Sequence, residues 1–200
     1  MSKGETARTN YVSVRDEIME RIQLRDNVLV MYLGAIGAIF GLVLNNQALA
    51  LEALLVIPYL ALGATAIISQ HHAMIGSLGL FLATELEPFL KDIGEYAPQW
   101  DTSKTIQTKS HRFSWLGRRV GHIIIIDIPA IIALALNWRH SIYLPLGDLL
   151  LWWSGVVLTT LSILTLFATS KWRKQLYRQL NVELEKNDSK KHGRKGVTGK

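Results

Sequence analysis

Asp127 is the residue whose type and position point most directly to chemistry. It is the single acidic residue of the apolar run 120–136, and Pro129 follows two positions later. A carboxylate at the centre of a membrane helix costs about 2.5 to 3.5 kcal/mol on insertion scales, so it faces protein or water rather than lipid. Such a group can line a proton or ion path, or it can serve as a structural hydrogen-bond anchor that fixes helix register. Pro129 supports a polar surrounding because it releases the backbone carbonyl of Ile125.

Depth along the chain predicts the neighbours of Asp127. This residue lies seven positions inside its apolar run, counted from Val120. Antiparallel helices that cross a bilayer bring residues of equal depth together, because every residue adds about 1.5 Å. The same count along the other apolar runs predicts a polar layer around Asp127 that contains Tyr32, Thr65, Ser162 and Thr165.

Three histidines are the candidates for metal binding. His71 and His72 lie at one end of the second apolar run, and His122 lies at the corresponding end of the third. Imidazole is a common metal ligand, but neither an HxxxH nor an HExxH spacing is present. Neighbouring histidines on a helix also point about 100° apart. The sequence therefore predicts neither a metal site nor a cofactor, with these three histidines as the weak candidates.

Catalytic signatures are missing from the sequence. The tetrapeptide from Gly76 to Gly79 is GSLG, which does not match the GxSxG nucleophile elbow. The segment 193–200, GRKGVTGK, lacks the glycine spacing of a phosphate-binding loop. The basic tail 186–200 also has no interleaved aromatic residues, so contact with anionic lipid or a role in solubility is favoured over nucleic acid. We expect a protein that is not an enzyme.

The elements that must position these residues follow from the uneven distribution of charge. The chain has 200 residues, of which 49% are hydrophobic and 19% are charged, values that also fit a soluble domain. However, Glu52 is the only Asp, Glu, Lys or Arg between Asn27 and Thr84, and there is none in 149–170. The sequence predicts an all-α, four-helix transmembrane bundle in one domain, 11–185. Its predicted spans are residues 27–44, 49–69, 120–137 and 149–170.

Two spans carry special backbone residues. The first contains small residues at fourth-residue spacing, which let helices approach closely in lipid, and they mark either a neighbouring helix or a dimer face. These residues are Gly34, Gly37, Ala38 and Gly41. The alternative is that glycine is simply frequent in membrane helices. In the second span, Pro58 predicts a kink near Leu54 to Tyr59.

Amphipathic segments continue from the spans on one side. They cover residues 11–26, 70–90, 103–119 and 171–185, and each has an apolar stripe at helical spacing. We expect these extensions to pack as a helical collar; the alternative is that each lies flat on the membrane. Residues 91–103 are expected to form a loop, and residues 1–10 and 186–200 are expected to be disordered.

The basic residues predict the orientation in the membrane. With four spans, 21 of the 22 Lys and Arg residues share one side and only Arg139 lies opposite. The positive-inside rule then places both termini and the 70–121 connection in the cytoplasm. No signal peptide is visible, so the first apolar run is interpreted as a retained anchor. The lack of cysteine fits a reducing compartment, and we expect the inner membrane as the location.

Two segments carry a resemblance in layout. The segments YVSVRDEIMERIQLRDNVL (11–29) and HHAMIGSLGLFLATELEPFL (71–90) resemble uncharacterised bacterial four-span membrane proteins. The layout is also similar to membrane effectors and accessory proteins of bacterial antiviral systems. This resemblance transfers no site residues.

The resemblance implies an effector that forms homo-oligomers and permeabilises the bilayer when a cytoplasmic protein engages 70–121. A non-catalytic membrane anchor or scaffold for a cytoplasmic complex is the alternative function. A small transporter is less favoured, because the sequence shows neither an internal repeat nor a second intramembrane charge.

Overall fold

The computed structural model describes residues 3–45, 51–94, 120–141 and 146–195, and all regular elements in these ranges are helical. This confirms the all-α prediction. The elements are α1 (Lys3–Asn45), the 3-10 helix η1 (Leu51–Val56), α2 (Ile57–Phe81), the π-helix η2 (Leu82–Leu86), α3 (Glu87–Asp92), the π-helix η3 (Ile123–Asp127), α5 (Ile128–Ser141) and α6 (Leu146–Lys195).

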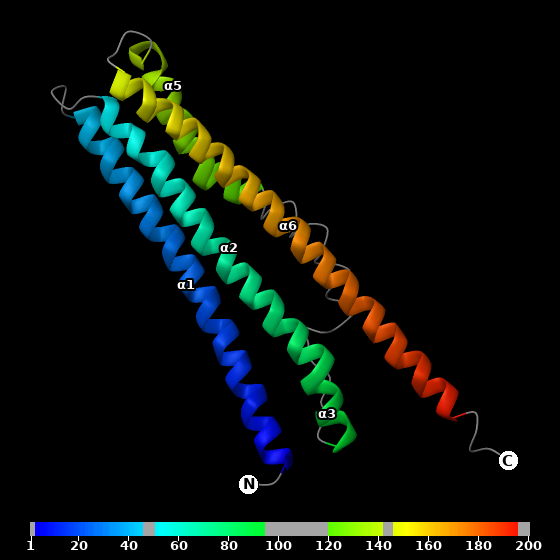
Figure 1. Cartoon of the computed structure of the whole chain (residues 1–200). Helices are drawn as coiled ribbons and strands as arrows, with labels where there is room; N and C mark the ends of the chain where they lie inside the picture. The colour runs from blue at the N-terminus through cyan, green and yellow to red at the C-terminus, as the bar shows by residue number, and fades with distance from the viewer. Residues whose placement is uncertain (1–2, 46–50, 95–119, 142–145, 196–200) are drawn as a thin grey trace.

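The helices form a long bundle in which α2 is central. Figure 1 shows α2 between α1 and α6, with α5 beside α6 at the end away from both termini. We call that end the loop end and the opposite one the terminal end. Helix α2 packs against α1, α5 and α6, and α1 and α6 diverge toward the terminal end. Helix α2 therefore separates the two outer helices along most of the bundle.

Four helices of the described residues are long and apolar enough to cross a membrane, as predicted. They are Lys3–Asn45, Leu51–Asp92, Val120–Trp138 and Leu149–Leu176. Their contacts bury a narrow core, centred on α2 and lined by α1, η3 and α5. Its fully buried side chains include Leu54, Ile57, Ile68 and Ile126. Most other apolar side chains of these helices face outward, as expected where the solvent is lipid.

Two helices are longer than the sequence analysis predicted. Helix α1 begins at Lys3, whereas disorder was expected up to Asn10, and α6 extends to Lys195, ten residues beyond its predicted end. Once a helix has formed, each added residue gains a hydrogen bond at little further cost, so a polar segment without proline extends it. Ala7 is also buried, which gives the first turns of α1 a packing contact.

The three prolines of the helices occupy irregular turns. Pro58 lies in the first turn of α2, directly after η1, so the expected kink takes the form of a change from 3-10 to α-helix. Pro88 and Pro129 each follow two residues after a π-helix, η2 and η3. A proline cannot donate to the carbonyl four residues earlier, and the wider π turn accommodates this loss. The helix therefore passes Pro88 and ends at Asp92, two residues beyond the predicted end of the 70–90 extension.

Three of the four predicted extensions are helical in the described residues. The extensions 11–26, 70–90 and 171–185 continue α1, α2 and α6 as helices, and 103–119 lies outside the described residues. In the apolar stripe of the 70–90 extension, Leu82 and Leu86 are buried, whereas Phe89 is exposed. A Cβ at Gly76 would lie 3.5 Å from the Trp172 ring, so α2 and α6 touch there. Val14, Ile18 and Ile22 of α1 are only half-buried.

Candidate functional site

The candidate site is a buried polar layer to which each of the four candidate spans contributes one side chain. Tyr32 comes from α1, Thr65 from α2, Asp127 from η3 and Ser162 from α6. Thr65, Asp127 and Ser162 are 0% exposed and Tyr32 is 5% exposed. Equal depth along antiparallel helices brings them together, which is the geometry that the sequence analysis expected. We call these four residues the polar layer.

Hydrogen bonds connect three of these side chains in a row. The Ser162 hydroxyl donates to Asp127 Oδ1 over 2.7 Å, and Thr65 Oγ1 lies 2.8 Å from Ser162 Oγ. A serine hydroxyl has a single hydrogen. Since Ser162 uses that hydrogen toward Asp127, Thr65 must be the donor to Ser162. The row runs from α2 through α6 to η3 and connects these three elements at the depth of Asp127.

Tyr32 attaches α1 to the same level through the backbone. Its hydroxyl donates to the carbonyl oxygen of Ile126 over 2.6 Å. Ile126 belongs to the π turn of η3, where the Ile128 N–H reaches back to the Ile123 carbonyl. Wider turns of this kind are common at functional sites, because they change which carbonyls and side chains face the interior. The π turn thus presents Asp127 to α6 and the Ile126 carbonyl to α1.

One carboxylate oxygen of Asp127 is left open. Asp127 Oδ2 is buried and has no hydrogen-bond partner among the residues that the structure describes. A buried polar atom without a partner costs about 1 to 3 kcal/mol, and more when it is charged. A proton or a small cation on this oxygen removes that cost. The arrangement is therefore suited to proton or cation binding between the four helices.

Two other residues predicted for this layer have different roles. The Thr165 hydroxyl donates to the Leu161 carbonyl of its own helix over 2.8 Å, a bond that Thr commonly forms in helices. It therefore does not join the hydrogen-bonded row. Pro129 is half-buried and acts through the backbone, as the proline that follows η3.

The small residues of α1 face outward. Gly34, Gly37, Ala38 and Gly41 are all exposed, and a Cβ added at any of the three glycines would meet nothing within 4 Å. They therefore do not form the close contact with another described helix that was one of the two predictions. Their role as a dimer face stays a prediction.

The tight glycine contact of the described chain is at Gly155 of α6. A Cβ there would lie 2.9 Å from Leu134 Cδ2 and 3.3 Å from Pro58 Cγ. Gly155 thus lets α6 approach α5 and the start of α2 closely. A single glycine without a repeat carries no sequence signal for this role, so the sequence analysis missed it.

Two of the three candidate histidines come together. The rings of His72 on α2 and His122, just before η3, lie 5.5 Å apart between centroids at an angle of 75°. His72 is buried. Within the described ranges, no group of three or more His, Cys, Asp or Glu residues is placed to hold a metal ion. The pair is a ring contact at one end of the third candidate span.

A second group of buried polar contacts lies near the loop end. The Asn137 side-chain amide donates to the carbonyls of Leu51 and Ala133, each over 2.9 Å. Trp152 Nε1 donates to the Leu134 carbonyl over 3.0 Å, where α6 meets α5. The sequence analysis missed Asn137. In the sequence, Asn137 is a polar residue at the end of an apolar run. Such a position is usually solvated, so the pattern did not indicate a buried role.

Comparison of the chain with protein-family models, with curated proteins and with solved structures finds no match.

Proposed function

We propose that this chain is a multi-pass inner-membrane protein that acts as an oligomerising, channel-like effector, with both termini in the cytoplasm. The observation that carries the proposal is the open Oδ2 of Asp127 in a layer built from all four candidate spans. Ionisable residues inside a membrane bundle commonly mark ion or proton paths. The partners of this protein are the bilayer, further copies of the chain and a cytoplasmic protein that engages 70–121.

Continuity of the helices supports control from outside the membrane. Tyr32 lies on α1, Thr65 on α2 and Ser162 on α6, and each of these helices continues well toward the terminal end (Figure 1). A partner that moves the extensions also moves the hydroxyl groups around Asp127. Hydrogen bonds weaken steeply beyond their ordinary length, so a displacement of about 1 Å breaks the row. The released hydroxyls and carboxylate then line a path for water, protons or ions.

Membrane depolarisation on overexpression tests this function. We expect the unaltered chain to depolarise cells that carry a potential-sensitive dye. Asp127→Asn reduces the effect because the ionisable group is lost while a polar side chain remains, and Asp127→Leu abolishes it because no polar group remains. Thr159→Val is the matched control, since the Thr159 hydroxyl is buried but bonds only to the Gly155 carbonyl of its own helix. Equal depolarisation by both Asp127 variants and the unaltered chain would contradict a conducting role for Asp127.

Purified protein in liposomes identifies the permeating species. A pH-sensitive dye inside the vesicles reports protons, and a potassium gradient with a potential-sensitive dye reports potassium. The effector proposal predicts a leak in at least one assay, and Gly37→Leu lowers it if copies of the chain meet on the exposed small-residue face of α1. A leak-free protein that forms no oligomer in detergent would contradict the proposal.

Exposed apolar side chains on the extension of α1 favour a second function, a scaffold for a soluble complex. Val12, Met19 and Leu24 are exposed in a segment that also carries many charged residues. Apolar side chains on a solvated surface commonly mark a protein contact. The scaffold proposal predicts no depolarisation and a co-purified partner that is lost with Met19→Glu. Retention of that partner by Met19→Glu would contradict this use of α1.

A further inference from the structure

Helix α6 carries one continuous outward stripe through its apolar part. Exposed side chains recur at alternating spacings of three and four residues, which keeps them on one face of a helix. They are Leu150, Trp153, Val157, Thr160, Leu164 and Phe167. Val157 is 55% exposed and Leu164 56% exposed, so these side chains face away from the described helices. In a membrane it faces lipid.

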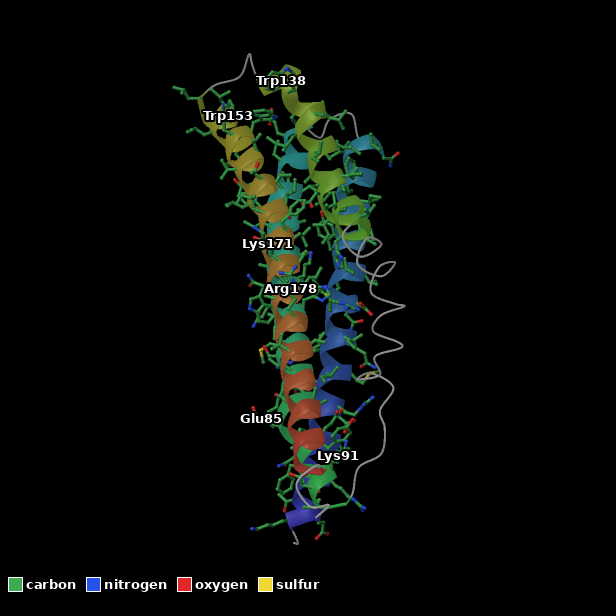
Figure 2. The ribbon with its side chains drawn as sticks, turned by 90° about the vertical axis from the view of Figure 1, so that its right-hand side faces the viewer. Glu85, Lys91, Trp138, Trp153, Lys171 and Arg178 are labelled. Atoms are coloured by element: carbon green, nitrogen blue, oxygen red, sulfur yellow. The ribbon has the colours of Figure 1, made fainter. Side chains whose placement is uncertain are left out.

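The same stripe continues as basic residues where the apolar run ends. The next positions at the same spacing are Lys171, Lys174 and Arg178, and all three are exposed. Figure 2 shows Trp153, Lys171 and Arg178 in this order along α6. On the opposite side, Trp172 and Leu176 lie against Gly76 of α2. That contact fixes the rotation of α6, so the three basic side chains point in the direction of the lipid-facing stripe.

Counted along α6 from the apolar run, these three basic residues lie at the depth of the lipid headgroups. The uncharged run 149–170 has 22 residues, about 33 Å of helix, which matches a hydrocarbon core of roughly 30 Å. Lys171 is therefore at the boundary, Lys174 about 4.5 Å beyond it and Arg178 about 10 Å beyond it. The headgroup region on each side of a bilayer is about 5 to 7 Å thick. Flexible Lys and Arg side chains reach phosphate groups from all three positions.

The two segments that meet beside the basic stripe contain no acidic residue. Neither 171–182 on α6 nor 70–84 on α2, which faces it, contains Asp or Glu. The charge that balances the stripe must come from outside these two segments. We propose that Lys171, Lys174 and Arg178 form a binding site for the phosphate groups of anionic phospholipids. This inference depends on the membrane placement proposed above, but on neither the effector nor the scaffold function.

A single fluorescent label tests the lipid preference. The chain contains no cysteine, so Gln175→Cys gives one attachment point beside the basic stripe. The labelled protein is reconstituted in phosphatidylcholine vesicles that contain a small fraction of brominated lipid, either phosphatidylglycerol or phosphatidylcholine. Bromine quenches the label on contact. The ratio of the two quenching efficiencies gives the relative association constant of the anionic lipid at this site.

We expect a ratio well above one, because each Lys or Arg near the surface favours anionic lipid about fivefold. Lys171→Gln/Lys174→Gln/Arg178→Gln lowers the ratio by about tenfold or more. The matched control is Lys3→Gln/Arg8→Gln/Lys91→Gln, which removes the same charge. Its residues lie toward the terminal end, where Figure 2 shows Lys91 far from Lys171. In about 1 M salt, where the screening length is about 3 Å, the ratio of the unaltered stripe falls toward one.

The possible outcomes separate this inference from the membrane placement. Equal ratios for the stripe variant, the control variant and the unaltered stripe would overturn the lipid site while leaving the membrane placement intact. A label that neither brominated lipid quenches would overturn both. A ratio that falls equally in both triple variants would show a general charge effect and would also overturn the specific site.

Discussion

Ser162→Ala removes the central link of the polar layer and is the sharpest test of that layer. The substitution deletes the donor to Asp127 Oδ1 and, with the same atom, the acceptor of the Thr65 hydroxyl. It leaves all other atoms of the layer in place. Because Ser162 is 0% exposed, water cannot replace the lost hydroxyl without a rearrangement of the helices.

The magnitude follows from the number of bonds that each variant breaks. Side-chain hydrogen bonds in membrane bundles contribute about 0.6 kcal/mol on average and up to about 1.7 kcal/mol. Ser162→Ala breaks two of them and leaves both oxygens of Asp127 without a described partner, so we expect a loss of about 1 to 3 kcal/mol. Thr65→Val breaks one bond and keeps the Ser162–Asp127 pair, which gives about 0.6 to 1.7 kcal/mol. Thr159→Val breaks only a bond to its own helix and should cost less than either.

Reversible unfolding in mixed detergent micelles measures these differences. Far-ultraviolet circular dichroism follows the loss of helix as the fraction of denaturing detergent rises, and the midpoint shifts give relative free energies of unfolding. The expected order of destabilisation is Ser162→Ala, then Thr65→Val, then Thr159→Val. If Ser162→Ala unfolds at the same detergent fraction as Thr159→Val, the hydrogen-bonded row does not contribute to stability and our reasoning is refuted.

Three further substitutions test other contacts in the same unfolding assay, and a fourth, Gly37→Ala, is the control for the glycine contact. Gly155→Ala should lower the free energy of unfolding by about 1 to 2 kcal/mol, because overpacking against Leu134 outweighs the gain in helix propensity. Gly37→Ala, whose Cβ meets open space, should leave the free energy of unfolding unchanged or raise it by up to about 1 kcal/mol. Tyr32→Phe should cost about 0.6 to 1.7 kcal/mol through the lost bond to the Ile126 carbonyl, and no change would mean that α1 is held by apolar packing alone. Asn137→Leu removes two donors and should cost about 1 to 3 kcal/mol, with an unchanged midpoint contradicting this.

Depth in the bundle was predictable from the sequence, but the direction of each side chain was not. The rise per residue alone placed Tyr32, Thr65 and Ser162 at the level of Asp127. Thr165 was included because it lies only three residues from Ser162. Its hydroxyl instead bonds to its own helix, since a rotation around the helix axis depends on contacts that the sequence does not state.

The glycines illustrate the same limit for packing. The repeat at Gly34, Gly37 and Gly41 was a strong pattern, yet these residues face outward in the described chain. Gly155 belongs to no repeat and fills the closest contact. A spacing rule states which positions share a helix face, and only the arrangement of the neighbouring helices decides whether that face is covered.

Prolines gave the positions of the irregular turns, but not their geometry. Pro58 predicted a kink and Pro129 predicted a released carbonyl, and each lies next to an irregular turn. The lost donor can be accommodated by a helix start, by a kink or by a wider turn, and the choice depends on tertiary packing. Residues such as Asp127 that belong to an irregular turn could therefore be placed by depth, although the π turn itself could not be foreseen.

The two π-helices have a consequence for which changes in chain length this protein tolerates. A π turn holds one residue more than an α turn and returns the chain to the same helical phase afterwards. Loss of one residue within Ile123–Asp127 or Leu82–Leu86 therefore keeps both flanking helices in phase, with a kink at the proline that the wider turn had accommodated. The same loss in the middle of α5 rotates everything after it by about 100°. A single residue can thus be lost from either of these two short segments without rotating the helix that follows it.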